Sequence, residues 1–147
     1  MKYLKKFLIV LLVVVAFYIF LKENPSVNLP DSGKPIGNSQ SVTEAFRERL
    51  SNIQIRGSGI VSRILSDDNY GNRHQRFIVR ISQSLTVFVA HNIDLAQRIN
   101  NLKRGDEVEF YGEYEWNSKG GVIHWTHHDP NGRHKSGWLK HRGRVYR

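Results

Sequence analysis

The spacing of apolar and polar residues divides the chain into three parts. Residues 7–21 are apolar without interruption, whereas residues 22–40 show no hydrophobic period and hold three of the four prolines. From Ile53 onward, apolar residues recur at every second position, which is the period of a strand with one buried face. The pattern therefore predicts a hydrophobic segment over residues 1–22, an extended linker over 23–40 and a folded domain over 41–147.

The apolar N-terminal run is typical of an export signal, because Lys2, Lys5 and Lys6 precede it. It is shorter than the roughly 20 residues of a usual spanning helix, but no well-formed small-residue cleavage site follows it. We expect an uncleaved signal anchor with its lysines in the cytoplasm. The prediction is a single-pass protein of the bacterial inner membrane with a periplasmic domain, or a secreted protein if the signal is cleaved.

A short amphipathic helix is expected at the start of the folded domain. The residues from Ser41 to Glu44 have the spacing of a capping box. Ala45, Phe46 and Leu50 then recur at helical spacing, which predicts a helix that continues to about Asn52 and packs on the domain.

The alternating region predicts five strands. The first strand begins at Ile53. The other four cover His74 to Ile81, Leu85 to Ala90, Glu107 to Trp116 and Gly121 to His128. A short helix from Leu95 to Leu102, capped by Asn92 or Asp94, is expected between the third and fourth strands. This order predicts a mainly β domain, a small five-stranded Greek-key barrel of the oligonucleotide/oligosaccharide-binding (OB) type. An SH3-like barrel is the main alternative, but it normally lacks that helix.

The last two predicted strands can be placed in register, because the loop over residues 117–120 pairs Trp116 with Gly121. Tyr114 then lies opposite Ile123, and Gly112 lies opposite Trp125, which predicts that Trp125 packs in the core over a glycine. The opposite face receives the polar residues. The expected pairs are Glu113 with His124, Tyr111 with Thr126 and Glu109 with His128.

Residues 124–141 contain five of the seven histidines and two of the three tryptophans. Imidazole and carboxylate groups are common ligands of zinc and manganese. The candidate ligands of a divalent metal are His124, His128, Glu109, Glu113 and Asp129. The spacing is not that of a helical His-Glu-x-x-His motif. A ladder of complementary charges between two strands is an equally good interpretation.

The charge of the chain favours an anionic partner. The formal net charge is +9 and the isoelectric point about 10.0. OB barrels bind single strands through basic grooves and stacking aromatic rings. The candidate ligand-binding residues are Arg73, Arg76, Arg80, His127, His134, Trp138, Lys140, Arg142 and Arg144. Tyr111 is a further candidate for stacking. Cysteine is absent, which excludes thiol catalysis and disulfides.

Four motifs in order carry a family resemblance. They are Arg73-His74-Gln75-Arg76-Phe77, the residues from Val89 to Leu95, those from Glu109 to Glu115, and those from Gly121 to Pro130. With Gly137, Trp138 and His141, they resemble the bacterial family of unknown function numbered 3465. The resemblance implies a small protein of the bacterial envelope. It supplies no substrate, cofactor or site residue.

Together these patterns predict a membrane-tethered, extracytoplasmic OB-like barrel that binds a polyanion, with single-stranded nucleic acid as the first candidate. The alternative is a metal-dependent hydrolase, similar to a phosphodiesterase, that uses the histidine-rich residues 124–141. A third possibility is an envelope scaffold that binds another protein.

Overall fold

The computed structural model describes residues 39–147. The predicted signal anchor over residues 1–22, and the linker as far as residue 38, lie outside the described residues. No helix within residues 39–147 has the length and apolar character needed to cross a bilayer.

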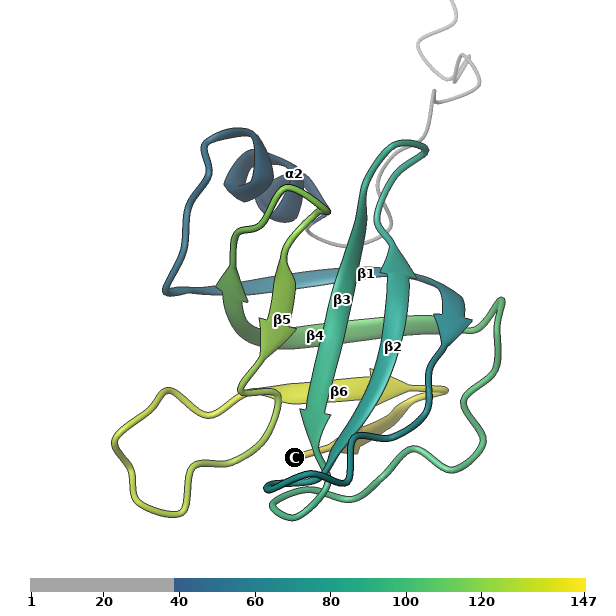
Figure 1. Ribbon diagram of the computed structural model, residues 1–147, viewed down its shortest axis with the longest axis vertical. Coiled ribbons are helices and arrows are strands. Elements are labelled where there is room, and N and C mark those ends of the chain that lie inside the picture. Colours follow the sequence, from purple (N-terminus) through teal and green to yellow (C-terminus); the bar gives the residue numbers. More distant parts are fainter. Residues whose placement is uncertain (1–38) are drawn as a thin grey trace, which may run out of the picture. The chain divides into compact units, whose positions relative to one another are not determined.

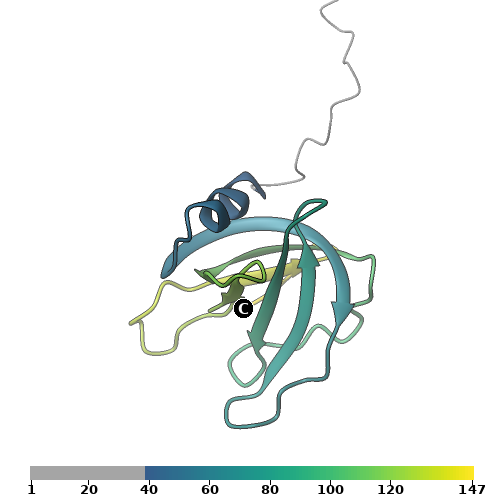
Figure 2. The ribbon, with the colours of Figure 1, turned by 45° about the horizontal axis from the view of Figure 1, so that its top comes forward.

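Five of the strands pair in a closed ring, and Figures 1 and 2 show the barrel that they form. They are β1 (Ile53–Ile64), β2 (His74–Arg80), β3 (Thr86–Asn92), β4 (Glu107–Glu115) and β5 (Val122–His124). Their order is β1-β2-β3-β5-β4, and β4 pairs with β1 to complete the ring. All of these pairs are antiparallel except β3 with β5. The predicted mainly β, closed five-stranded barrel is confirmed.

A further hairpin extends the sheet from β4. It consists of β6 (Trp138–His141), which pairs with β4, and β7 (Arg144–Tyr146). Arg142 and Gly143 form its two-residue turn and both have positive φ, 48° and 80°, as the tightest hairpin turns require. This hairpin extends the sheet beyond the five strands that the alternation predicted.

With the exception of Trp125, the predicted alternation places the core correctly. The fully buried apolar side chains include Phe77, Val79, Val89, Phe110, Tyr114, Ile123 and Leu139. The helix α2 (Ser39–Arg47) packs on this core through Val42 and Ala45. Trp116 joins the helix to the barrel, because its indole Nε1 donates a hydrogen bond to the carbonyl oxygen of Phe46.

The helix predicted from Leu95 to Leu102 is wrong, because turns connect β3 to β4. Asn92 caps a single turn at the start of this segment, and the contacts of Gln75 then hold the backbone out of a continuing helix. The amide oxygen of Asn92 accepts hydrogen bonds from the backbone N–H groups of Asp94 and Leu95. The buried Gln75 bonds both the N–H and the carbonyl of Ile99. The short helix of the domain is α2, which ends at Arg47 and not near Asn52.

The predicted register of the last hairpin is confirmed as far as His124 and wrong beyond it. Glu113 pairs with His124 and Tyr114 with Ile123. Trp125 has a φ of 50° and turns the chain out of the sheet. Trp125 is therefore not a core residue over Gly112. The expected pairs of Tyr111 with Thr126 and Glu109 with His128 do not form, because β6 occupies that edge of β4 with Trp138 and Lys140.

Gly112 marks the point where one edge of β4 changes partners. Residues 113–115 pair with β5, and residues 108–111 pair with β6. The chain leaves β5 here, runs out through the loop over residues 125–137, and returns as β6. A Cβ atom at Gly112 would lie 2.5 Å from the carbonyl oxygen of His124 and 2.8 Å from Cγ2 of Thr126. The absence of a side chain therefore lets the chain cross β4 at close range.

Gly112→Ala should destabilise the domain by about 1–3 kcal/mol, the usual cost of forcing a methyl group into a packed site. The clash involves a backbone oxygen, which cannot move aside as the end of a side chain can. Urea denaturation followed by tryptophan fluorescence measures the change. A variant as stable as the wild type would contradict the close approach.

A buried histidine ties the end of β3 to the start of this loop. His91 is 0% exposed. Its Nε2 lies 3.3 Å from the carbonyl oxygen of Gln97, to which it must donate, so the neutral Nδ1 accepts from the Thr126 hydroxyl at 2.8 Å. Burial lowers the pKa of His91 from 6.5 to about 4. Protonation would charge an imidazole that water cannot reach.

The free energy of unfolding should therefore fall as the pH drops from 6.5 to 4. Over this range the unfolded state binds a proton at His91 and the folded state does not. The resulting loss in the free energy of unfolding approaches about 3 kcal/mol. Urea titrations at several pH values should show that His91→Gln lacks this component. Equal pH dependence in the wild type and the variant would refute the assignment.

Candidate functional site on the outer face of β4

The outward side chains of β4 form a polar row that neighbouring strands extend on both sides. Glu109, Tyr111, Glu113 and Glu115 alternate with the buried residues of the strand. On one edge β1 places Gln54 beside Glu113, Arg56 beside Tyr111 and Ser58 beside Glu109. On the other edge β5 contributes His124, and β6 contributes Trp138 and Lys140. This face carries several of the candidate residues that the sequence singled out, namely Glu109, Glu113, His124, Trp138 and Lys140.

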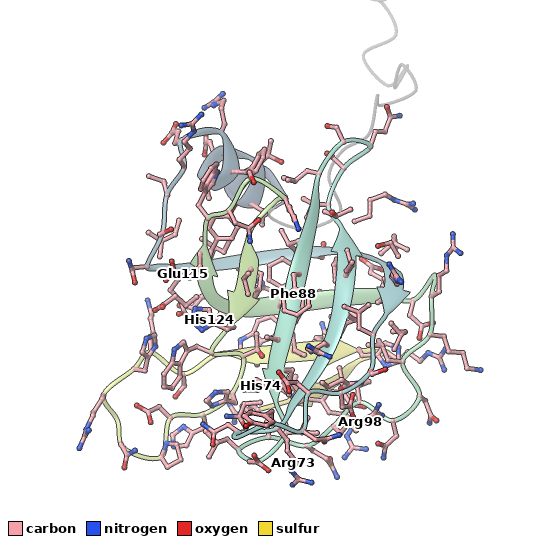
Figure 3. All side chains as sticks on the ribbon, viewed as in Figure 1. Arg73, His74, Phe88, Arg98, Glu115 and His124 are labelled. Carbon is pink, nitrogen blue, oxygen red and sulfur yellow. The ribbon has the colours of Figure 1, made fainter. Side chains whose placement is uncertain are left out.

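One part of the face is a cluster of carboxylate and imidazole groups. Glu113, Glu115 and His124 each place one ligand atom within 4.8 Å of the others. Nε2 of His124 lies 3.4 Å from Oε1 of Glu113. Figure 3 shows Glu115 and His124 close together at one side of the barrel, apart from Arg73 and Arg98.

The loop over residues 125–137 brings a second imidazole to this cluster. Nε2 of His134 lies 2.9 Å from Oε2 of Glu113. The His134 ring stacks on Trp125, with centroids 4.0 Å apart and planes 3° from parallel. The loop holds its shape because the Asp129 carboxylate accepts the backbone N–H groups of Asn131, Arg133 and His134. These hydrogen bonds, led by that from Asn131, lower the pKa of Asp129.

Several buried polar atoms of this cluster have no hydrogen-bond partner. They are Nε2 of His124, Nδ1 of His134 and both amide atoms of Gln54. Leaving such groups unpaired usually costs about 1–3 kcal/mol each. Burial lowers the pKa of His124, although Glu113 and Glu115 act to raise it. The net shift favours the neutral imidazole, which has a free lone pair.

The next part of the face pairs aromatic rings with cations. Tyr111 and Trp138 lie side by side, with ring centroids 6.2 Å apart. The Arg56 guanidinium lies 5.2 Å from the centroid of Trp138, and Nζ of Lys135 lies 5.8 Å from that of Tyr111. Both rings remain partly exposed. We call these four residues the aromatic–cation cluster.

Beyond this cluster the charges are paired with one another. Glu109 contacts Lys140 at 2.7 Å and Arg56 at 3.1 Å. The hydrogen bond from Lys140 and that from Arg56 lower the pKa of Glu109 against the opposing effect of burial. A surface hollow of about 400 Å³ begins at Glu109 and Lys140 and continues past Asp106 and Arg142. Glu109 and Asp106 pair with Lys140 and Arg142. Glu107 also lines the hollow, and its negative charge does not favour an anionic ligand.

The structure brings together only two of the residues proposed as metal ligands, Glu113 and His124. The Glu109 carboxylate pairs with Lys140 and Arg56. The Asp129 carboxylate accepts hydrogen bonds from backbone N–H groups of its own loop. His128 is exposed, and its Nδ1 lies 3.0 Å from the hydroxyl of Ser136. Sequence reasoning missed Glu115 as a member of this cluster, although its spacing from Glu113 already placed it on the same face. No local signal in the sequence could have placed His134 beside Glu113.

The residues proposed to bind a polyanion do not share one surface. Trp138, Lys140 and His134 lie on or beside the outer face of β4. The others are elsewhere and mostly engaged: Arg73 with Asp94, Arg76 with Asp68, Arg142 with Asp106, and Arg144 with Gln97. Arg80 is exposed at the end of β2, and His127 is buried. Arg56 and Lys135 were not among the candidate ligand-binding residues.

Comparison with known protein families gives a match for the chain. A family model described as a protein of unknown function (DUF3465) matches residues 30–147. None of the curated proteins compared with the chain matches it. The matched residues include the whole barrel, the C-terminal hairpin and every residue of the site described above. The chain therefore belongs to the DUF3465 family, as its motifs predicted.

Proposed function

We propose that the domain is an OB-like barrel that binds a polyanionic ligand on the outer face of β4, with single-stranded nucleic acid as the first candidate. The strand order and the parallel pairing of β3 with β5 support the OB-like assignment. OB barrels usually bind ligands across strands 2 and 3. In this domain the aromatic rings and cations gather on β4 instead.

The aromatic–cation cluster carries the proposal. Tyr111 and Trp138 provide two neighbouring ring faces, and Arg56 and Lys135 lie within 6 Å of them. Proteins that bind single strands use this combination, because bases stack on rings while phosphates meet cations. The net charge of +9 adds long-range attraction for an anionic ligand.

The proposal includes a location. A signal anchor over residues 1–22 would hold the domain outside the bacterial inner membrane, on a linker over residues 23–40. The basic and apolar N-terminal residues support this arrangement. The ligand would then be a polyanion of the envelope or exterior, for which single-stranded DNA is a convenient probe.

Trp138→Ala should weaken binding of a fluorescent single-stranded oligonucleotide by about 5–150-fold, because stacking on one ring is worth about 1–3 kcal/mol. Lys135→Glu should also weaken binding and reduce its dependence on salt, since fewer counterions are then released. Fluorescence anisotropy of the full-length protein, measured at several salt concentrations, reports both effects.

Two matched variants control for general loss of rings or charge. Tyr70 is 93% exposed in the β1–β2 loop, so Tyr70→Ala removes an aromatic ring from another surface. Lys119→Glu reverses an exposed charge in the β4–β5 turn. Both should retain the affinity of the wild type. Loss of binding in Tyr70→Ala with none in Trp138→Ala would place the ligand elsewhere, and absence of salt-dependent binding would refute the proposal.

A further inference from the structure

The geometry points to a divalent transition-metal site formed by Glu113, Glu115 and His124, with Zn²⁺ as the ion to which we commit. His134 acts as a positioning residue for Glu113. The site lies beside the aromatic–cation cluster, but it does not depend on binding of a polyanion. Its support comes from the charges, the unpaired atoms and the donor types of this cluster.

The charges of the cluster are not balanced by protein cations. Within residues 39–147, no lysine or arginine forms an ion pair with Glu113 or Glu115, whereas Glu109 on the same strand contacts both Lys140 and Arg56. The Glu113 side chain is only 14% exposed. Two carboxylates held this close repel each other, and a cation between them would remove that cost.

His124 supplies a nitrogen lone pair close to the Glu113 carboxylate. Nε2 of His124 is shielded from solvent, has no hydrogen-bond partner, and lies near Glu113. A metal ion accepts the lone pair of a neutral imidazole, so it would satisfy this atom without a proton. Gln54, which neighbours Glu113 across β1 and β4 and whose amide is also unpaired, offers further polar atoms at the edge of the site.

The distances fit a single ion after a small adjustment. Ligand atoms around one zinc ion lie at most about 4.2 Å apart, because each is about 2.1 Å from the metal. The three atoms already lie within 4.8 Å of one another, so side-chain movements of less than about 1 Å would close the site. His134 contacts the second oxygen of Glu113 at 2.9 Å, the arrangement by which outer groups orient a ligating carboxylate.

The donor types favour zinc over harder or softer ions. Magnesium and calcium prefer oxygen ligands alone, and copper(I) prefers sulfur. One imidazole with two carboxylates suits Zn²⁺, and three protein ligands leave a fourth position for water or another ligand. Manganese is the closest competitor on the same grounds.

Calorimetric titration of the full-length protein, first stripped with a chelator, tests the site with Zn²⁺ alone. One equivalent should bind saturably. Glu115→Gln and His124→Gln should each weaken that binding at least about tenfold, since each removes a direct ligand. Cobalt(II) in place of zinc should give visible absorption bands typical of a tetrahedral site, and these bands should be lost in the same variants.

Two matched variants separate this site from chance binding by histidines on the surface. Glu107→Gln removes an exposed carboxylate at the other end of β4, and His128→Gln removes an exposed imidazole of the neighbouring loop. Both should bind zinc as the wild type does. No saturable binding by the wild type, or zinc affinity lost in His128→Gln and kept in His124→Gln, would overturn the proposal. A comparison of thermal unfolding without metal shows that each variant is folded.

Discussion

The close passage of the chain over Gly112 is the constraint on which the site depends. Residues 107–114 of β4 pair with β1 on one edge, but on the other edge β4 is shared between β5 and β6. The crossing between these partners leaves no space for a Cβ at Gly112. Gly137 has the same requirement where the loop returns, because a side chain there would meet the backbone oxygens of Trp125 and Tyr111.

This crossing also builds the candidate site. The loop over residues 125–137 leaves the sheet at Trp125 and folds back, which brings His134 to the Glu113 carboxylate. Because Trp125 lies outside the core, its indole is available for the His134 ring to stack on. The hydrogen bonds of Asp129 stiffen the loop between them. A position that period-two alternation assigned to the core thus serves to orient a functional group.

The outer face of β4 joins two clusters with opposite electrostatic character. The aromatic–cation cluster presents rings and positive charge, which suit an anionic ligand. In the part of the chain that the structure describes, no lysine or arginine pairs with the neighbouring carboxylates, and this cluster contains unpaired buried atoms, which suit a metal ion. The two proposals use different residues and different probes. They are nevertheless adjacent, because Tyr111 and Glu113 are two positions apart on the same strand.

The sequence by itself determined the elements whose pattern is local. Alternation identified the barrel strands and their buried faces, and the loop length fixed the pairing of Glu113 with His124. The sequence could not determine where β5 ends, because the end of β5 depends on competition from β6 for the same edge of β4. It also predicted a helix at residues 95–102, where the buried Gln75 from a distant strand holds the backbone in turns. The contact of His134 with the Glu113 carboxylate was decided by the tertiary structure, since loop closure joins residues whose spacing has no period.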